Sequence, residues 1–578
     1  MFARVFNGLR ARGAPLYGVA AVPTVTFQIP WAVLVMVVAG YLLVGIGDYG
    51  LLDNNEGLYA EGAREMLASG DFVIPRLNDV TYLEKPPLFY MLVAGVFAAL
   101  GELESVARLV SVLAAVACLV GTMRFAAALG RDQAGRLAAL MLGSSVGFVL
   151  MARVVMPDML FTTLLNLALF SGYLALRQRN PRHLRASCVL LALAVLTKGW
   201  LACALFVLVF GVYVLLRPHA ERRDLLRIFL DVPAWLLFVA VVAPWHVLAV
   251  LQDADFAWFY FVNEHMLRFL GLREPRDYYA GSLFYYLPRI LLFLCPWLIY
   301  LPLLLPRYRP ADGDFDAESF LWAACLAPLA FFSFSIAKGN YYLLVAMPAL
   351  ALLIAFRLES LVAANRHRRP SLTFWVLLLG LAMVAVFSWE AKMAFLEPLP
   401  ATAALANILV LAAFLAISAA GYLLIRRGRH SAGVIALSLL FAPFLGLLLY
   451  LLTVGEPYAS SRPLANHLVT VCRDCPVFVY RDFERLSSLP FYLKHPVGIV
   501  DSDSKDLYFS QRRGEGKNIF TTTAEFLGRA RRQPALLVVH DQRMVDFRQS
   551  PIAIEAEPLT KIGYVSVFRL AATERGGR

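Results

Sequence analysis

The chain has 578 residues, of which 60% are hydrophobic and only 16% are charged, with a mean hydropathy of +0.65. A soluble protein of this length would carry about 25% charged residues, so the composition excludes an ordinary soluble globular protein. The formal net charge is +12, but the arginines lie between apolar runs. The positive-inside rule accounts for that placement, and no nucleic-acid partner is expected.

Apolar runs of roughly 17–25 residues recur from residue 31 to about residue 453, and each is long enough to cross a bilayer core of about 30 Å. The runs are continuous rather than alternating, which favours helices over transmembrane strands. The sequence therefore predicts a polytopic α-helical membrane protein. No cleavable signal peptide is evident, because no small-residue cleavage site follows the first run.

With the N-terminal arginines in the cytoplasm, the first spanning helix is predicted over 31–47 and runs outward. The first outer loop, 48–104, contains an amphipathic helix at 56–70 and a shorter apolar helix at about 86–101. If the shorter helix crossed the membrane, the later Arg-rich loops would fall on both sides of it unless another helix were broken. We therefore expect it to lie along the outer membrane surface, so that the Arg-rich loops all fall inside.

Twelve further spans follow from the same alternation, which gives a prediction of about thirteen in all. Three are expected at about 105–127, 134–152 and 158–176, and two more lie on either side of an outer turn at 196–200. The next span ends near residue 250, and the one after the outer loop at 251–285 ends at Arg307. One span then leads to an outer segment at 335–342, one runs from there to Arg366, a pair ends at Arg426, and the last is at about 431–453.

After residue 455 the composition changes to short apolar runs of strand type that alternate with helical patterns. The strand-like runs are 476–480, 496–500, 534–540 and 564–568, and the helical patterns are 463–469, 486–494 and 522–532. This alternation predicts a small α/β domain. We therefore divide the chain into a membrane domain, 1–454, and a domain of residues 455–578 that the topology places in the periplasm.

Two of the seven cysteines, Cys472 and Cys475, form a CRDC segment in this outer domain. A redox-active CxxC would follow a strand and open a helix, whereas this one precedes a strand. We expect an inert or disulfide-linked turn, as suits an oxidising compartment. The other five cysteines lie in apolar helices, where cysteine is a small buried hydrophobe.

The outer loops hold nearly all of the unusual polar residues. These are Asp53, Asn55, Glu56, Glu84 and Lys85 in the first loop, Asp158 before the fourth span, Glu264, His265 and Arg268 in 251–285, and Lys338 and Tyr342 after the ninth span. Singly, each has an ordinary explanation: Asp158 as a helix cap, Lys85 and Lys338 as interfacial charges, Glu56 as solvation of a surface helix, His265 as a loop histidine. Together these residues favour one chemistry. The cations suit a phosphate, and the carboxylates suit a sugar, a metal or a proton transfer. The set therefore predicts group transfer from a lipid phosphate.

The stretch DNNEGLYAEGAREMLASGDFVIPRLNDVTYLEKPPLFY (53–90) resembles the first periplasmic loop of bacterial lipid-carrier-dependent glycosyltransferases of the GT-C fold. This family includes the aminoarabinose transferase that modifies lipid A and, more distantly, the protein O-mannosyltransferases. Further matching segments follow in order: MPD (156–158), TKG (197–199), NEHMLRF (263–269) and SIAKGNYYLLVAMPALALL (335–353). The resemblance implies an inner-membrane enzyme that moves a sugar from undecaprenyl phosphate to lipid A or another periplasm-facing glycolipid, or alternatively to a protein or polysaccharide.

The resemblance also implies roles for particular residues. Lys85 and Arg268 would hold the carrier phosphate, with Lys338 beside them, and Tyr342 would close the carrier site. A divalent metal, Zn²⁺ or Mg²⁺, would sit near Glu84 and His265. An acid of the first loop would lie near the anomeric carbon.

One position departs from the family pattern Asp-Glu-x-x-Tyr-Ala, because Asn55 occupies the place of the aspartate. An amide cannot act as a general base. Either Glu56 or Asp53 takes that role, or no strong base is needed, which is reasonable if the acceptor is an already anionic phosphate. Asp158 would then orient the acceptor or complete the negative rim.

Two other classes of protein fit the sequence less well than a transferase. A lipid transporter should have internal repeats or broken helices with polar residues at mid-membrane, whereas here the polar residues gather on one face. A membrane-anchored binding protein, with the α/β domain as its working part, would leave Lys85, Asp158 and His265 without a role.

Overall fold

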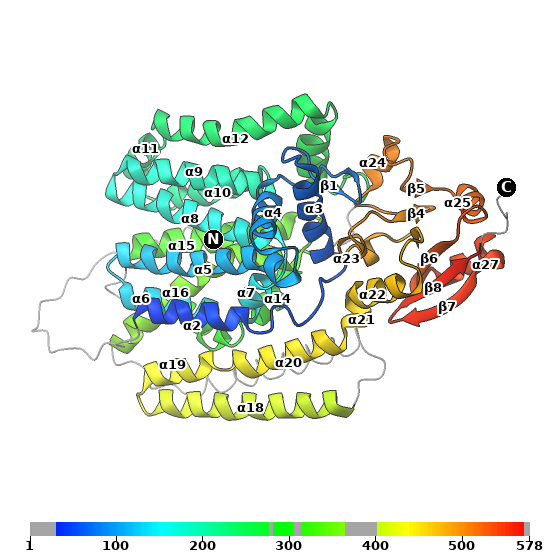
Figure 1. Cartoon of the computed structure of the whole chain (residues 1–578). Coiled ribbons are helices and arrows are strands. Elements are labelled where there is room, and N and C mark those ends of the chain that lie inside the picture. The colour runs from blue at the N-terminus through cyan, green and yellow to red at the C-terminus, as the bar shows by residue number, and fades with distance from the viewer. Residues whose placement is uncertain (1–29, 277–280, 306–313, 364–400, 572–578) are drawn as a thin grey trace, which may run out of the picture.

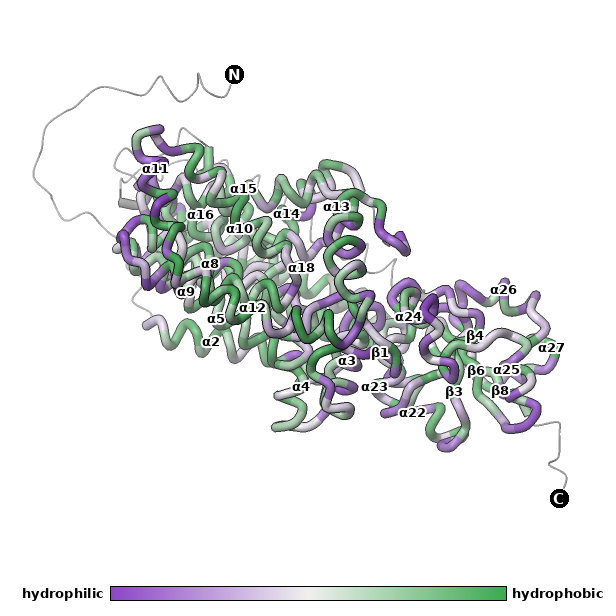
Figure 2. The backbone as a smooth tube through the Cα atoms, turned by 90° about the horizontal axis from the view of Figure 1, so that it is seen from above, coloured by the Kyte–Doolittle hydropathy of each residue, from purple (hydrophilic) through white to green (hydrophobic). Residues whose placement is uncertain are grey.

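A computed structural model describes residues 30–276, 281–305, 314–363 and 401–571. Most of these residues form a bundle of roughly aligned helices, and a smaller α/β domain lies against one end of the bundle (Figure 1). The helices of the bundle are largely apolar, whereas the small domain has hydrophilic loops around apolar strands (Figure 2). In the chain, the last helix of the bundle ends at Val454 and the small domain follows it.

Seven helices among the described residues are long and apolar enough to cross a membrane. They are α5 (Glu104–Ala128), α8 (Pro157–Gln178), α12 (Val232–Gln252), α15 (Phe315–Phe334), the segment Asn340–Ser360 formed by η5 and α16, α18 (Ala401–Arg426), and the segment Ser431–Val454 formed by α19 and α20. An eighth is reached if α6 (Asp132–Gly143) and α7 (Val146–Ala152) count as one span. The chain is therefore a multi-pass membrane protein.

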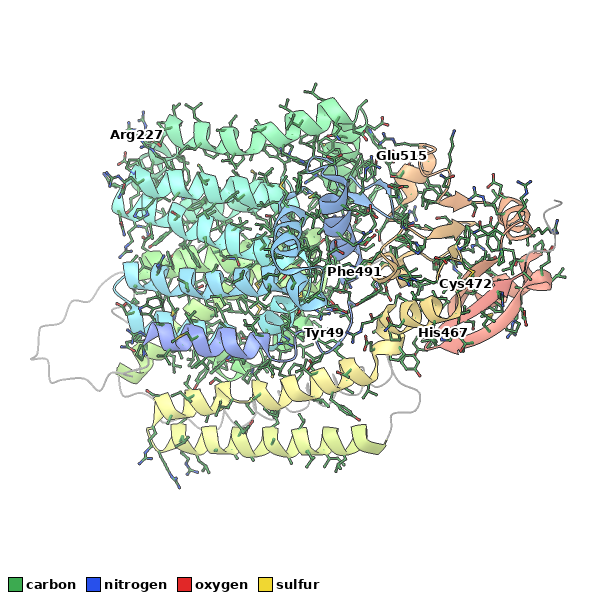
Figure 3. The ribbon with its side chains drawn as sticks, viewed as in Figure 1. Tyr49, Arg227, His467, Cys472, Phe491 and Glu515 are labelled. Carbon is green, nitrogen blue, oxygen red and sulfur yellow. A yellow bond between two sulfur atoms is a disulfide. The ribbon has the colours of Figure 1, made fainter. Side chains whose placement is uncertain are left out.

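Shorter helices occupy the remaining predicted spans. They are α2 (Trp31–Leu43), α9 (Pro181–Lys198), α10 (Leu201–Leu215), and α14 (Tyr286–Leu294) with the 3₁₀ helix η3 (Trp297–Leu304). The eleventh predicted span lies within 364–400, outside the described residues, so the count of thirteen stays a prediction. Figure 3 shows Arg227, in the Arg-rich helix α11 (His219–Ile228), at the end of the bundle away from the small domain.

The third predicted span, 134–152, is not straight, because α6 and α7 meet at an angle of 69°. At the break, the hydroxyls of Ser144 and Ser145 donate to the carbonyls four residues earlier, at Leu140 and Met141. Hydroxyls bonded in this way compete with the helical ladder and bend helices. The prediction of one continuous helix was therefore wrong at this point.

The first loop folds over the end of the bundle that faces the small domain (Figure 1). It contains α3 (Glu56–Ser69), the hairpin β1 (Arg76–Leu77) and β2 (Val80–Thr81), and α4 (Leu88–Leu100). Gly57 lets α3 pack directly on the small domain, because a Cβ at this position would collide with the backbone at Ser487 and Ser488.

The small domain contains a six-stranded sheet in the order β5-β4-β3-β6-β8-β7. The first four strands in this order are parallel, and β8 and β7 add to them as an antiparallel edge. The strands are β3 (Val477–Tyr480), β4 (Gly498–Val500), β5 (Phe520–Thr521), β6 (Ala535–His540), β7 (Glu557–Ile562) and β8 (Val565–Leu570). The four predicted strands are confirmed, whereas β5 has only two residues and β7 is a mostly exposed edge, so neither carries an apolar pattern.

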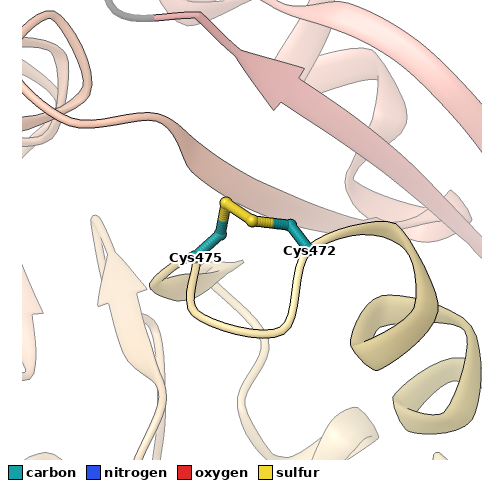
Figure 4. The surroundings of a disulfide bond; sticks show 2 residues. All are labelled: Cys472 and Cys475. Carbon is teal, nitrogen blue, oxygen red and sulfur yellow. A yellow bond between two sulfur atoms is a disulfide. The ribbon is translucent and has the colours of Figure 1, made fainter.

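Two short helices precede these strands and five more connect them. They are α21 (Glu456–Ala459), α22 (Arg462–Val471), α23 (Leu489–Leu493), α24 (Tyr508–Arg512), α25 (Thr523–Ala530), α26 (Met544–Gln549) and α27 (Ile552–Glu555). Cys472 and Cys475 are disulfide-bonded across the turn between α22 and β3, as expected for a linked turn (Figure 4).

The first loop and the small domain share one apolar core. Leu58 and Tyr82 of the loop pack in the same cluster as Val479 and Ile499 of the sheet. The side chain of Asn78 adds polar contacts, since it accepts from the Val497 N–H at 2.8 Å and donates to the Val497 carbonyl at 2.9 Å. The loop is thus fixed between the bundle and the small domain, which holds its polar residues in place.

Candidate functional site

A cavity of about 480 Å³ lies where the first loop meets the bundle. Its walls come from the first loop, the start of α8, the α9–α10 turn, the π-helix η2 (Trp258–Leu267) with α13 (Arg268–Leu270), and the α15–η5 junction. The polar and aromatic lining residues are Tyr59, Glu84, Lys85, Asp158, Lys198, Trp200, Glu264, His265, Arg268, Ser335, Tyr341 and Tyr342. Six residues predicted from the sequence as phosphate-binding, catalytic or metal-binding therefore line this one cavity: Glu84, Lys85, Asp158, His265, Arg268 and Tyr342.

Glu264 lies at the centre of a buried charge network. It accepts hydrogen bonds from Arg268 Nη1 at 2.7 Å and from Arg273 Nε, and Lys85 Nζ lies 3.8 Å from its Oε2. Burial alone would raise the pKa of Glu264, but Arg273, Arg268 and Lys85 together lower it to about 2. Glu264 is therefore ionised at any physiological pH.

The cations of this network also contact Glu84. Glu84 pairs with Arg273, and its Oε2 lies 3.5 Å from Lys85 Nζ. The side chain of Arg273 is only 3% exposed, whereas those of Lys85 and Arg268 are 14% and 25% exposed. Arg273 thus contacts the two acids on their buried side, whereas Lys85 and Arg268 line the cavity, where cations suit an anionic ligand.

A second ion pair closes the opposite wall. Asp158, in the first turn of α8, pairs with Lys198 at the end of α9. The ammonium of Lys198 lies 4.6 Å and 4.9 Å from the ring centres of Tyr341 and Tyr342, within the range of a cation–π contact. A carboxylate held by a lysine beside two aromatic rings offers both charge and a flat surface to a sugar.

His265 is fixed by both of its ring nitrogens. Nε2 accepts from the Trp200 backbone N–H at 3.0 Å, and Nδ1 lies 2.6 Å from the Tyr260 carbonyl, to which it donates. Burial lowers the pKa of His265, which favours this neutral form. Gly199 makes the contact possible, because its φ is +88° and an added Cβ would collide with the imidazole.

The metal that the resemblance implies does not fit these contacts. A metal ligand needs a free lone pair on the imidazole, and both nitrogens of His265 are engaged. The carboxylate of Glu84 is taken up by Arg273, Lys85 and the Tyr82 hydroxyl. Within the described part of the chain, no group of three or more His, Cys, Asp or Glu could hold a metal ion. We therefore derive no step through a metal.

Glu56 does not line the cavity and is completely buried elsewhere. Its two oxygens accept from Arg108 Nε and Nη2 at 2.8 and 2.6 Å and from the backbone N–H groups of Leu52 and Val155. Arg108 also donates to three carbonyls in the segment that follows α2. These contacts join α3, α5, the segment after α2 and the turn between α7 and α8, and they give Glu56 a structural role.

Asp53 and Asn55 also lie away from the cavity lining. Asp53 accepts from the Ser488 backbone N–H at 2.7 Å and from the Ser461 hydroxyl at 2.9 Å, both in the small domain. Burial raises the pKa of Asp53 to about 7, although these hydrogen bonds lower it. Asn55 is exposed before α3 and forms no side-chain cap bond. The catalytic role that the sequence predicts for these residues gains no support from their positions.

Lys338 is buried at the end of α15, outside the lining of the cavity. Its ammonium donates to the carbonyls of Phe332 and Ser333 at 3.0 and 2.7 Å, which satisfies acceptors at the helix C-terminus. Tyr342, four residues later, lines the cavity and stacks on Phe332 at 4.3 Å. Lys338 and Tyr342, which lie in the same matching segment, thus differ in role.

Sequence reasoning missed Arg273 and Tyr341 and gave Lys198 no role. Lys198 had a signal, since it is an ionisable residue at the end of an apolar helix, and such residues are costly without a function. Arg273 gave no signal in the sequence, because an arginine in a polar loop is common. Tyr341 was hidden beside Tyr342 in the matching segment.

Residues 84–248 match a family described as dolichyl-phosphate-mannose-protein mannosyltransferase. Over 381 residues the chain is 30% identical to undecaprenyl phosphate-alpha-4-amino-4-deoxy-L-arabinose arabinosyl transferase 1 of Pseudomonas fluorescens, a match that covers 64% of this chain and 68% of that protein. The corresponding transferases of Pseudomonas paraeruginosa and Pseudomonas aeruginosa are 31% and 32% identical over 375 and 382 residues. Each of these two matches covers 64% of this chain and 65% of the relative.

Among solved structures, ArnT from Cupriavidus metallidurans bound to undecaprenyl phosphate superposes with a TM-score of 0.76 at 24% identity, over 95% of this chain and 99% of that one. The apo oligosaccharyltransferase of Archaeoglobus fulgidus superposes with a TM-score of 0.50 at 11% identity, over 89% of this chain and 70% of that one. At these identities the likeness concerns the fold. It confirms the predicted GT-C architecture, a helical membrane domain with an additional α/β domain.

Proposed function

The chain belongs to the family of undecaprenyl phosphate-α-4-amino-4-deoxy-L-arabinose arabinosyl transferases, and we propose that it transfers an aminoarabinose-type sugar from undecaprenyl phosphate to lipid A. The observation that carries this proposal is that the cations Lys85 and Arg268 and the Asp158–Lys198 pair line one cavity. Cations on one wall suit the carrier phosphate, and a carboxylate with aromatic rings on the other suits the sugar.

The apolar part of the cavity supports a lipid-borne donor. Met266, Phe269 and Leu270 line it, yet Met266 and Leu270 are 64% and 56% exposed. Large apolar side chains exposed on the surface of a membrane bundle face lipid tails. A polyprenyl chain can therefore lie along this side while its phosphate enters between Lys85 and Arg268.

In the proposed reaction, the bond between the anomeric carbon and the carrier phosphate oxygen breaks as a new bond forms to a phosphate oxygen of lipid A. Undecaprenyl phosphate leaves with an additional negative charge, which Lys85 and Arg268 stabilise. Positive charge develops on the sugar, and the Asp158 side chain, which pairs with Lys198, is placed to stabilise it, as carboxylates do in glycoside transfer. The attacking phosphate is already anionic, so no strong base is needed, and Asn55 in place of an acid is no obstacle.

The same proposal fixes the orientation. The small domain lies at the end of the bundle opposite Arg227 (Figure 3). The first loop, which forms part of the cavity wall, packs against this domain, and Arg-rich loops belong in the cytoplasm. We therefore place the chain in the bacterial inner membrane, with its N-terminus cytoplasmic and residues 455–578 in the periplasm.

The test is transfer by purified protein in liposomes that contain carrier-linked aminoarabinose and lipid A, with products identified by mass. We expect lipid A that has gained one aminoarabinose per modified phosphate. Asp158→Asn should lower turnover by roughly a hundredfold, which corresponds to about 2.7 kcal/mol of barrier, while Asp255→Asn, at an exposed position outside the cavity lining, should leave it unchanged. Active wild-type protein with equal turnover in both variants would remove Asp158 from the mechanism.

A further inference from the structure

The small domain contains a second cavity, of about 490 Å³, at the amino ends of its parallel strands. It is lined by Pro476, Val477, Phe478, His495, Pro496, Gly498, Asn518, Ile519, Arg529, Arg532, Gln533 and Ala535. These residues come from the starts of β3, β4, β5 and β6 and from the end of α25. We call this cavity the amino-edge pocket.

Its position is informative because ligands of parallel sheets usually bind at the carboxyl edge. Here the loops after β3 make contact with the first loop, since Ser488 N–H and the Ser487 hydroxyl bind Asp53 and Asn54. The carboxyl edge is thus occupied by packing on the membrane domain. The amino edge remains as an open cavity of the sheet.

No acid lines the amino-edge pocket, although Glu525, one turn earlier in α25, lies within electrostatic range of Arg529. Arg529 donates only to the carbonyls of Lys517 and Asn518, both at 3.4 Å, and no described residue pairs with the guanidinium of Arg532. His495 Nδ1 donates to the Pro496 carbonyl at 2.9 Å, which leaves Nε2 to face a ligand.

Several other arginines of the small domain form ion pairs. Arg481, Arg485, Arg513 and Arg543 each pair with an aspartate, and Arg531, which lies between the two pocket arginines in sequence, pairs with Glu555 at 2.5 Å. Two arginines that form no ion pair with a described carboxylate, on one concave surface, suit an external anion, because the guanidinium fork matches a phosphate or carboxylate.

The walls of the pocket are fixed and partly apolar. The Cys472–Cys475 disulfide closes the turn that leads directly into Pro476 and Val477 (Figure 4). Val477, Phe478 and Ile519 form an apolar floor, which suits the face of a sugar ring rather than a bare inorganic ion. Beside His495, Lys494 pairs with Glu102 at the turn before α5, at 2.7 Å. One rim of the pocket therefore continues to the outer surface of the bundle.

We propose that the amino-edge pocket binds an anionic sugar of the acceptor glycolipid, with Arg529, Arg532 and His495 as the anion-binding groups. The assignment to the acceptor rests on the proposed function, whereas anion binding itself does not. A phosphate and a carboxylate on a sugar share the chemistry that these groups recognise. The pocket would anchor the saccharide part of the acceptor while its reacting phosphate lies in the catalytic cavity.

The test uses the full chain in lipid nanodiscs and calorimetric titration with glucose 6-phosphate, glucuronic acid and uncharged glucose. We expect saturable binding of at least one charged sugar and none of glucose, and the preferred charged sugar identifies phosphate or carboxylate as the recognised group. Arg529→Gln combined with Arg532→Gln should weaken binding at least tenfold. Arg531→Gln, the matched control, should change it less than twofold. All three side chains are exposed, and unchanged melting temperatures verify the fold.

No saturable binding to the wild type, or equal binding by the double variant, overturns the proposal. In the transfer assay, the double variant should raise KM for lipid A and leave kcat and the KM for the donor unchanged. An unchanged KM for lipid A would overturn the assignment to the acceptor. Anion binding that persists in a protein without transfer activity would support the pocket and count against the proposed function instead.

Discussion

Glu56 of the first loop and the cavity acids Asp158 and Glu264 are alike in type and differ in what surrounds them. Glu56 is completely buried, and both of its oxygens are used by Arg108 and two backbone N–H groups. Asp158 and Glu264 are also nearly buried and paired, but their partners line an open volume. In the first region the charges hold elements together, and in the second they form a surface for a ligand.

This difference separates stability from catalysis. Removing one partner of a completely enclosed pair leaves an unpaired charge in the interior, which costs folding free energy. Removing one partner at the cavity leaves a charge that water reaches, so the protein folds and the loss falls on the ligand. The predictions below test this division, in order of decreasing effect.

Glu56→Gln should have the largest effect, and on folding rather than turnover. It leaves Arg108 buried without its carboxylate, a change that costs about 3–5 kcal/mol in comparable pairs. We expect a lower yield of monodisperse protein and a lower melting temperature. Asn55→Ala, at the adjacent exposed position, is the control and should match the wild type. A Glu56→Gln protein of normal stability with a hundredfold lower turnover would place Glu56 in the reaction.

Lys85→Ala should lower transfer without affecting the fold. A charge-assisted contact to the carrier phosphate contributes about 1.5–3 kcal/mol, which corresponds to a loss of roughly 10- to 150-fold in kcat/KM for the donor. Lys494→Ala removes an exposed lysine that pairs with Glu102 and should change kcat/KM less than twofold. Normal transfer by a well-folded Lys85→Ala protein contradicts phosphate binding by this residue.

Much of the fold could be predicted because membrane helices have strong local signals. Long apolar runs and Arg-rich loops identified a helix for every predicted span that the structure describes. The bend at Ser144 and the π-helix over Trp258–Leu267 could not be predicted, because both depend on which hydrogen bonds the backbone selects after packing. β7 was missed for the opposite reason, since an exposed edge strand has no apolar pattern.

The site was predicted unevenly, for a physical reason. Lys85, Asp158, His265 and Arg268 lie in segments that the family resemblance aligns, and all four line one cavity. Glu56 lies in such a segment as well, but its partner Arg108 is 52 residues away in sequence. A sequence shows that an acid is present and does not show whether another residue already neutralises it.

His265 provides a smaller effect that distinguishes positioning from metal binding. His265→Ala leaves the Trp200 N–H without an acceptor in a largely buried place, which costs about 1–3 kcal/mol, and turnover should fall roughly tenfold. In His265→Gln the side-chain oxygen can take the place of Nε2 as an acceptor, so most of the turnover should return, within about threefold of the wild type. Chelators should have no effect on any of the three proteins. Chelator-sensitive turnover, equally low in both variants, would restore the metal site at Glu84 and His265.

The smallest expected effect is on the pH dependence of stability, through Asp53. Burial raises the pKa of Asp53 to about 7, whereas an exposed aspartate has a pKa near 3.9. The protonated side chain therefore favours the folded state fully below about pH 4, and this contribution is lost as the pH rises to about 7. Asp53→Asn stays neutral and keeps an acceptor for Ser488 and a donor toward Ser461. The melting temperature of Asp53→Asn relative to the wild type should thus increase by a few degrees from pH 5 to pH 8. Groups that titrate in both proteins affect both melting temperatures equally, so their effect drops out of the difference. A difference that stays constant over this range would mean that Asp53 is ionised in the folded protein, and it would return this residue to the candidates for a base.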